Sequence, residues 1–183
     1  IRETTCPVSS ETVQVRDAGN PLQTVTKSLS LTILPAPTVV SIWSSTTEPG
    51  TVDGGADSSV ELGVKFKSDV AGTINGIRFY KATANTGTHI GNLWTSNGTW
   101  LAVVTFSNET ASGWQQALFA TPVTITSNTI YVVSYHADNG HYSADIDYFT
   151  GKGADNAPLH ALANGVSGAN GVYAYGTSSA FPN

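Results

Sequence analysis

The fold is decided by residues 59–150, a segment that contains VELGVKF at positions 60–66 and IYVVSYHADNGHY at positions 130–142. Apolar and polar residues alternate in these short runs, which is the pattern of half-buried β-strands. Four apolar residues of the first run share one face: Val60, Leu62, Val64 and Phe66. Clusters of Gly, Asn, Asp and Pro separate the runs and supply turns. The segment therefore predicts antiparallel strands joined by short turns.

The strongest hairpin signal is Asn97-Gly98, which stands between Trp94 and Trp100. Asn and Gly tolerate the positive φ angles of a two-residue turn, so a hairpin with such a turn is predicted. Further alternating runs follow, and only residues 158–162 suggest a helical turn. Many short strands without a helix-length pattern predict an all-β fold, an antiparallel β-sandwich of jelly-roll-like type.

Two more strands are predicted before this block, within residues 12–33, with turn chemistry at Asp17–Pro21 between them. This N-terminal β-hairpin resembles the last two strands of a bacterial immunoglobulin-like repeat. Two prolines then make residues 34–38 stiff and extended. We therefore expect two parts: residues 1–37, the tail of such a repeat with its linker, and residues 38–183, the β-sandwich.

Composition narrows the classes of partner. Charged residues make up 11% of the chain, against about 25% in ordinary globular proteins. The net charge is −5 and no Lys/Arg cluster occurs, which argues against nucleic acid. No apolar run approaches the ~20 residues of a membrane-spanning helix, so no membrane insertion is expected. Cys6 is the single cysteine and cannot form a disulfide within the chain.

Several motifs occur in fixed order: VELGVKF, TINGIRFYK, NTGTHIGNLW, FSNETASGWQQ and YVVSYHADNGHYS. Over roughly residues 40–182 they resemble a bacterial family catalogued as domain of unknown function four-zero-eight-two. The resemblance implies a secreted accessory module beside other domains of a longer chain, such as immunoglobulin-like repeats and polysaccharide-active enzymes. Family members continue past an AFP segment into a closing strand. We expect the 12–33 hairpin to take the place of that closing strand and to cover the sheet edge beside it, within one chain or in a strand-exchanged homodimer.

Candidate ligand-binding residues combine aromatic rings with a polar cluster. Exposed Trp and Tyr rings suit the apolar faces of sugars, although such rings also pack in cores. Histidines flank the turn at residues 137–140 and are candidates for a polar site, or for zinc or copper. The predicted ligand-binding set is Trp100, Trp114, His89, Glu109, His136, His141 and Tyr142.

Calcium is the other metal considered, because carboxylates and loop carbonyls are its preferred ligands. Asp53 and Asp57 lie in a Gly-rich loop and Glu61 follows it, so these three are predicted as a calcium site. A second acidic group stands at positions 138, 145 and 147. Solvated acidic turns are the alternative explanation of both groups.

Three functions remain open on the sequence. The first is a non-catalytic carbohydrate-binding module, secreted or on the cell surface, whose partner is a polysaccharide. The second is a polysaccharide-active or metal-dependent enzyme that uses the His/Glu cluster, although no G-x-S-x-G, H-E-x-x-H or phosphate-binding loop is present. The third is a structural or adhesion spacer. We expect the first.

Overall fold

The computed structural model describes residues 10–16, 24–30 and 39–183, and it divides the chain into two compact units, Ile1–Val39 and Val40–Asn183. In the first unit, β1 (Ser10–Arg16) and β2 (Thr24–Ser30) pair antiparallel, with Ser10 opposite Ser30 and Arg16 opposite Thr24. The predicted N-terminal hairpin is thereby confirmed. The turn at 17–21, the linker at 34–38 and Cys6 lie outside the described residues.

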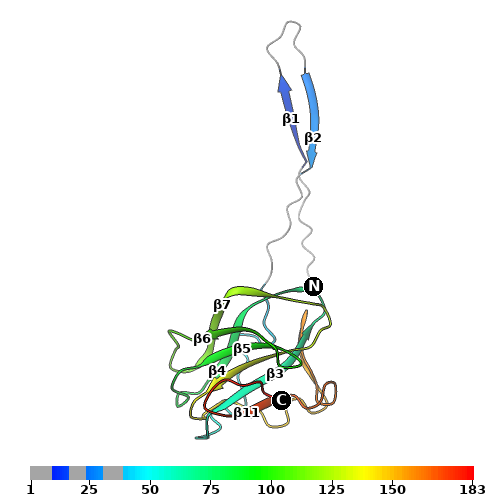
Figure 1. Ribbon diagram of the computed structural model, residues 1–183. Helices are drawn as coiled ribbons and strands as arrows, with labels where there is room; N and C mark the ends of the chain where they lie inside the picture. Colours follow the sequence, from blue (N-terminus) through cyan, green and yellow to red (C-terminus); the bar gives the residue numbers. More distant parts are fainter. Residues whose placement is uncertain (1–9, 17–23, 31–38) are drawn as a thin grey trace. The chain divides into compact units, whose positions relative to one another are not determined.

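The second unit is built from strands only (Figure 1). They are β3 (Val60–Ser68), β4 (Gly72–Lys81), β5 (Ile90–Thr95), β6 (Trp100–Thr105), β7 (Gly113–Ile125), β8 (Tyr131–Ala137), β9 (Ala154–Asn156), β10 (Leu159–Ala161) and β11 (Val172–Tyr175). Across the described parts of the chain, no helix is long and apolar enough to cross a membrane. The all-β prediction is confirmed.

Two sheets of unequal size make the sandwich. The larger has seven strands in the order β6-β5-β8-β3-β10-β9, with β11 also paired to β3. The smaller consists of β4 and β7 alone. The antiparallel pairs are nested along the chain, because β3 pairs with β8, β4 with β7 and β5 with β6. A long hairpin that rolls up on itself gives this nesting, which is the jelly-roll-like arrangement.

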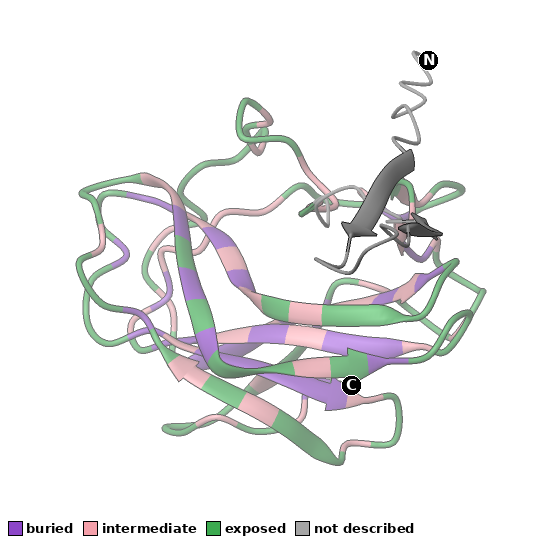
Figure 2. Cartoon of the chain, turned by 90° about the horizontal axis from the view of Figure 1, so that it is seen from above, coloured by how far each residue is buried: buried purple, intermediate pink, exposed green. Residues whose placement is uncertain are grey.

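The main core fills the space between β4–β7 and the facing half of the larger sheet. Alternate residues point inward, and Figure 2 shows buried and exposed positions alternating along the strands. Phe79 is central: its ring stacks on Tyr135 at 4.3 Å and meets Phe106 edge-on at 4.8 Å. The buried residues of this cluster are Phe66, Ile77, Phe79, Leu93, Phe106, Ala117, Phe119, Ile125 and Tyr131.

The opposite face of the larger sheet is covered by the last residues of the chain. Trp94, Val132 and Val172 form a second buried cluster, against which Phe181 packs. Pro182 is buried beside Gly63, where an added Cβ would come within 2.9 Å of the proline ring. Both faces of the larger sheet therefore carry buried apolar residues, and only part of its inner face is covered by the two-stranded sheet.

Two local predictions are corrected. The β5–β6 hairpin exists, but its loop comprises residues 96–98, with Gly98 at φ 87° and its N–H bonded to the Thr95 carbonyl. This is a three-residue loop with a bulge, because the Asn97 side chain bonds the Thr95 and Thr99 hydroxyls and so favours the wider turn. Residues 159–161 form β10 rather than a helical turn, because they pair with both β3 and β9.

Candidate functional site

The second unit contains a groove of about 680 Å³, which we call the aromatic groove. Its floor is the part of the larger sheet's inner face that β4–β7 leave uncovered, and its walls are the β4 edge and residues 43–49 and 142–149. Ligand sites typically have volumes of ~300–1,000 Å³. Its aromatic lining comprises Trp43, Phe79, Tyr80, Trp114, Tyr135, Tyr142, Tyr148, Phe149, Tyr173 and Tyr175.

Tyr173 and Tyr175 are the most exposed aromatic residues of this lining. They stand two residues apart on β11, opposite Leu62 and Val60, and therefore share the inner face of the sheet. Each residue is 56% exposed, and their ring centroids are 5.7 Å apart. Rings held on a strand but left open to solvent provide flat apolar area at low entropic cost.

A carboxylate fixes two of the tyrosines. Asp57 accepts hydrogen bonds from the hydroxyls of Tyr175 (2.8 Å) and Tyr142 (3.3 Å). The bond to Asp57 raises the pKa of Tyr175 to about 12, and the same bond lowers the pKa of Asp57. Asp57 is itself held in place because its loop pairs with the segment after β8 at Ala56 and Gly140. The tyrosines are thus preorganised.

The opposite wall is a set of interlocked rings. Trp114, the second residue of β7, donates its indole N–H to the Thr47 carbonyl (2.8 Å) and meets Tyr80 edge-on at 5.6 Å. The Arg78 guanidinium lies 4.5 Å over the Trp114 ring. Trp43 donates its indole N–H to the Tyr148 hydroxyl (2.9 Å). Both indole N–H groups therefore have a partner within the protein, which leaves ring faces for a ligand.

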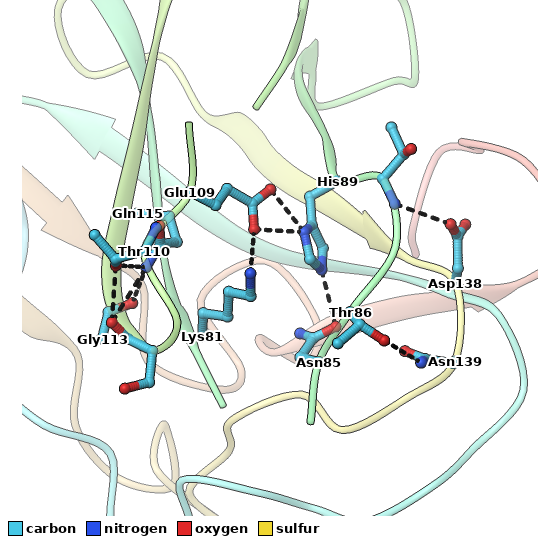
Figure 3. A network of polar contacts seen from close by, with 12 residues as sticks. Lys81, Asn85, Thr86, His89, Glu109, Thr110, Gly113, Gln115, Asp138 and Asn139 are labelled. Atoms are coloured by element: carbon cyan, nitrogen blue, oxygen red, sulfur yellow. Dashed lines mark hydrogen bonds and ion pairs between the residues drawn. The ribbon is translucent and has the colours of Figure 1, made fainter. Parts of the chain in front are cut away.

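The structure brings His89 and Glu109 together, but inside the protein rather than in the groove (Figure 3). His89 is fully buried; its Nδ1 lies 2.8 and 3.0 Å from the two Glu109 oxygens and its Nε2 2.9 Å from the Asn85 side-chain oxygen. Lys81 Nζ completes the network at 2.7 Å from Glu109. A buried charge needs such partners, so this pair stabilises the fold.

Glu61 and His136 form a second buried cluster, on the outer face of the larger sheet. Glu61 Oε1 accepts hydrogen bonds from Asn92 (2.8 Å) and Ser134, whereas Oε2 lies 3.5 Å from His136 Nδ1, beyond a good hydrogen bond. Burial raises the pKa of Glu61. Glu61 Oε2 and both His136 nitrogens have no hydrogen-bond partner among residues 39–183.

The three carboxylates predicted to bind calcium do not converge. Asp53 accepts from Gly55 N–H (2.8 Å) and contacts His141 Nδ1 (2.9 Å). Asp57 accepts a hydrogen bond from Tyr175 on the inner side of the larger sheet. Glu61 follows Val60, the residue opposite Tyr175, and therefore points to the outer side, because successive strand residues alternate. Within the described residues, no group of three His, Cys, Asp or Glu is placed to hold a metal.

The other predicted residues divide between the groove and elsewhere. Trp114 and Tyr142 line the groove. His141 is held by Asp53 in the loop beside Tyr142, and His136 is buried with Glu61. Trp100 is 52% exposed but stacks on Trp94 at 5.2 Å, on the outer side of the sheet where Phe181 packs.

Sequence reasoning missed the most exposed part of the groove. The alternation of Val172–Tyr175 puts Tyr173 and Tyr175 on one face of β11, a signal that was present in the sequence but was not used to include them in the predicted ligand-binding set. Arg78 and Trp43 carried no comparable signal, because only the packing of residues 41–49 against β4 and β7 places them at the groove.

Comparison with known families gives a match to the Domain of unknown function (DUF4082) over residues 46–183. The chain belongs to this family. The DUF4082 match includes every strand from β3 to β11, and thus both sheets and nearly all of the aromatic groove. No curated protein and no solved structure matches the chain.

Proposed function

We propose that this chain is a non-catalytic carbohydrate-binding accessory module of a secreted bacterial multi-domain protein, and that the aromatic groove is its glycan site. The observation that carries the proposal is the exposed pair Tyr173 and Tyr175 on the floor of a groove of about 680 Å³. Sugars bind proteins by laying their apolar ring faces on aromatic side chains while their hydroxyls meet polar groups.

The polar groups needed beside the rings are also present. Asp145 and Glu48 line the groove, and so does Tyr175, whose hydroxyl donates to Asp57. Asp145 is held by the Gly50 N–H (2.6 Å). Fixed polar groups beside fixed rings favour binding, because little side-chain entropy remains to be lost.

The geometry favours binding over turnover. General acid–base catalysis needs a group within hydrogen-bond reach of the substrate. The two histidines of the predicted His/Glu cluster are buried: His89 contacts the partly exposed Glu109, and His136 lies beside the buried Glu61. Secretion, the immunoglobulin-like origin of residues 1–37 and a structural calcium remain parts of the proposal, the last to be tested by metal analysis of the purified protein.

Affinity electrophoresis across a panel of soluble polysaccharides, followed by calorimetry with oligosaccharides of any glycan that retards the protein, tests the site. We expect Tyr173→Ala and Tyr175→Ala to weaken binding about tenfold each, as loss of one stacking ring costs roughly 1–2 kcal/mol. Trp100→Ala is the matched control, since it removes a ring of similar exposure (52%) from the other side of the sheet.

Failure of the whole panel to bind would leave the spacer function as the better explanation. Release of reducing ends or unsaturated products, abolished by Glu109→Ala or His136→Ala in folded protein, would instead establish an enzyme. Equal losses in Tyr173→Ala and Trp100→Ala would show that the glycan does not use the groove.

A further inference from the structure

We propose that Arg78 is an anion-binding subsite of the aromatic groove, and that the module selects glycans carrying a carboxylate, the uronic acids. This inference rests on the proposed carbohydrate-binding function and specifies its ligand.

The position of Arg78 follows from strand alternation. Ile77 and Phe79 point from β4 into the core, so Arg78 between them points to the other face, opposite Gln116 of β7. Its Cζ lies over the Trp114 ring, 4.5 Å from the ring centroid, and Nη1 donates to the Ser41 hydroxyl (3.0 Å) and the Trp43 carbonyl (3.4 Å). These contacts fix the plane of the guanidinium at the groove wall.

The guanidinium has unused capacity in that plane. Among residues 39–183, Nε and Nη2 of Arg78 donate no hydrogen bond to the protein, and no carboxylate lies within 4.0 Å of its nitrogens. Lys81, three residues along the same strand, has its carboxylate at 2.7 Å. A half-buried cation without a counter-charge is costly, and burial accordingly lowers the pKa of Arg78.

A carboxylate is the group that fits. Two parallel N–H donors of a guanidinium match the two oxygens of a planar carboxylate, and stacking on a ring preorganises that fork. In a glycan, such a carboxylate is carried at C5 of a uronic acid, whose sugar ring still offers an apolar face to the tyrosines and tryptophans of the groove.

The remaining charges of the groove limit the ligand further. Glu48, Asp145 and Asp147 also line it and are exposed. They repel additional negative charge, which disfavours densely sulfated glycans. The combination of a single cation on one wall with acidic groups elsewhere fits a glycan with one carboxylate at this subsite and a lower charge density than a sulfated chain.

The test uses matched pairs of oligosaccharides with the same backbone: fragments of glucuronoxylan, alginate and polygalacturonate, each beside its carboxyl-reduced form, with dextran sulfate and dextran as a further pair. For at least one of the three uronate pairs we expect the acidic member to bind the wild-type protein about tenfold or more tighter, the effect of one charge-assisted hydrogen-bond pair. Arg78→Gln should remove that preference. Arg78→Lys should lose most of it, because an ammonium cannot form the fork.

Lys67→Gln is the control for charge alone, since Lys67 lies on β3 and points to the sheet's outer side; it should leave the preference intact. Thermal melts confirm that each variant is folded, and Arg78→Lys keeps the positive charge if Arg78→Gln does not fold. The inference is overturned if reduced forms bind as well as acidic ones, if Arg78→Gln weakens both alike, or if dextran sulfate binds best. If the carboxyl-reduced oligosaccharides bind as well as the acidic ones and Tyr173→Ala abolishes that binding, the Arg78 subsite is overturned and the proposed function is preserved. If no oligosaccharide binds, both are overturned.

Discussion

Glu109→Gln separates a structural network from a binding site, because sequence reasoning placed Glu109 among the ligand-binding residues. Its carboxylate contacts His89 Nδ1 at 2.8 and 3.0 Å and Lys81 Nζ at 2.7 Å. The Glu109 and Lys81 side chains are 12% and 11% exposed, and that of His89 is fully buried. The amide oxygen of the variant can still accept a hydrogen bond, but the negative charge that faces His89 and Lys81 is lost.

Removing one partner of a buried ion pair costs about 3–5 kcal/mol. Because Glu109 and Lys81 retain some exposure, we expect the lower end, about 3 kcal/mol, at neutral pH. For a domain of this size each kcal/mol shifts the melting temperature by about 2–4 °C, so the loss should be about 6–12 °C. Urea unfolding followed by tryptophan fluorescence measures the free energy directly.

A double-mutant cycle with Lys81→Gln isolates the pair, and we expect a coupling energy above about 1 kcal/mol. At temperatures where the variants are folded, glycan affinity should equal that of the wild type. A destabilisation below about 1 kcal/mol would refute the structural role. Loss of glycan binding in folded Glu109→Gln protein would return Glu109 to the ligand site.

The other predictions concern single groups. Glu61→Gln keeps the acceptor at Oε1 and removes a carboxyl group whose pKa is raised by burial. The folded protein holds the proton of Glu61 more tightly than the unfolded chain does. The stability that Glu61 contributes is therefore present below the unfolded pKa and is lost as pH rises through the folded pKa. Urea titrations should therefore show that the free energy of unfolding of the variant rises relative to that of the wild type between acidic and neutral pH. A constant difference between the two proteins would contradict this. Asp57→Asn should lower the pKa of Tyr175 from about 12 toward about 10, seen by ultraviolet titration against a Tyr175→Phe difference spectrum; an unchanged titration would mean that their contact does not form. Gly140→Ala should destabilise by at least about 2 kcal/mol in urea unfolding, because residue 140 has φ 71° and an added Cβ would lie 2.3 Å from the Asp57 nitrogen; a smaller loss would show that the two segments separate easily.

Strand alternation was sufficient to predict the scaffold. The alternation of residues 60–66 gave the right strand, and Asn97-Gly98 gave the right hairpin with the wrong loop length. Pairings between distant strands, such as β3 with β8, leave no local trace in a sequence. Residues 159–161 were misread for that reason, since they become a strand only through their pairing with β3 and β9.

The kind of side chain at the candidate site could be predicted from the sequence, but not which residues of that kind line it. Aromatic residues were expected to carry recognition, and Trp114 and Tyr142 do line the groove. His89 and Glu109 were grouped correctly as neighbours, yet their burial could not be read from a polar loop sequence. Tyr173 was overlooked, because its exposure depends on the two-stranded sheet leaving part of the facing sheet uncovered.

That inequality between the sheets explains why stability and recognition depend on different residues. Where β4 and β7 cover the larger sheet, its inward side chains, such as Leu93, are fully buried and contribute to folding. Beyond the edge of β4 the same inner face continues onto β11, where Tyr173 and Tyr175 have no facing strand and remain open. Their apolar area has not been used in folding and is available to a ligand. The buried ionic pairs lie outside this open area, so substitutions there should change the free energy of unfolding, whereas those on β11 should change affinity with little effect on stability.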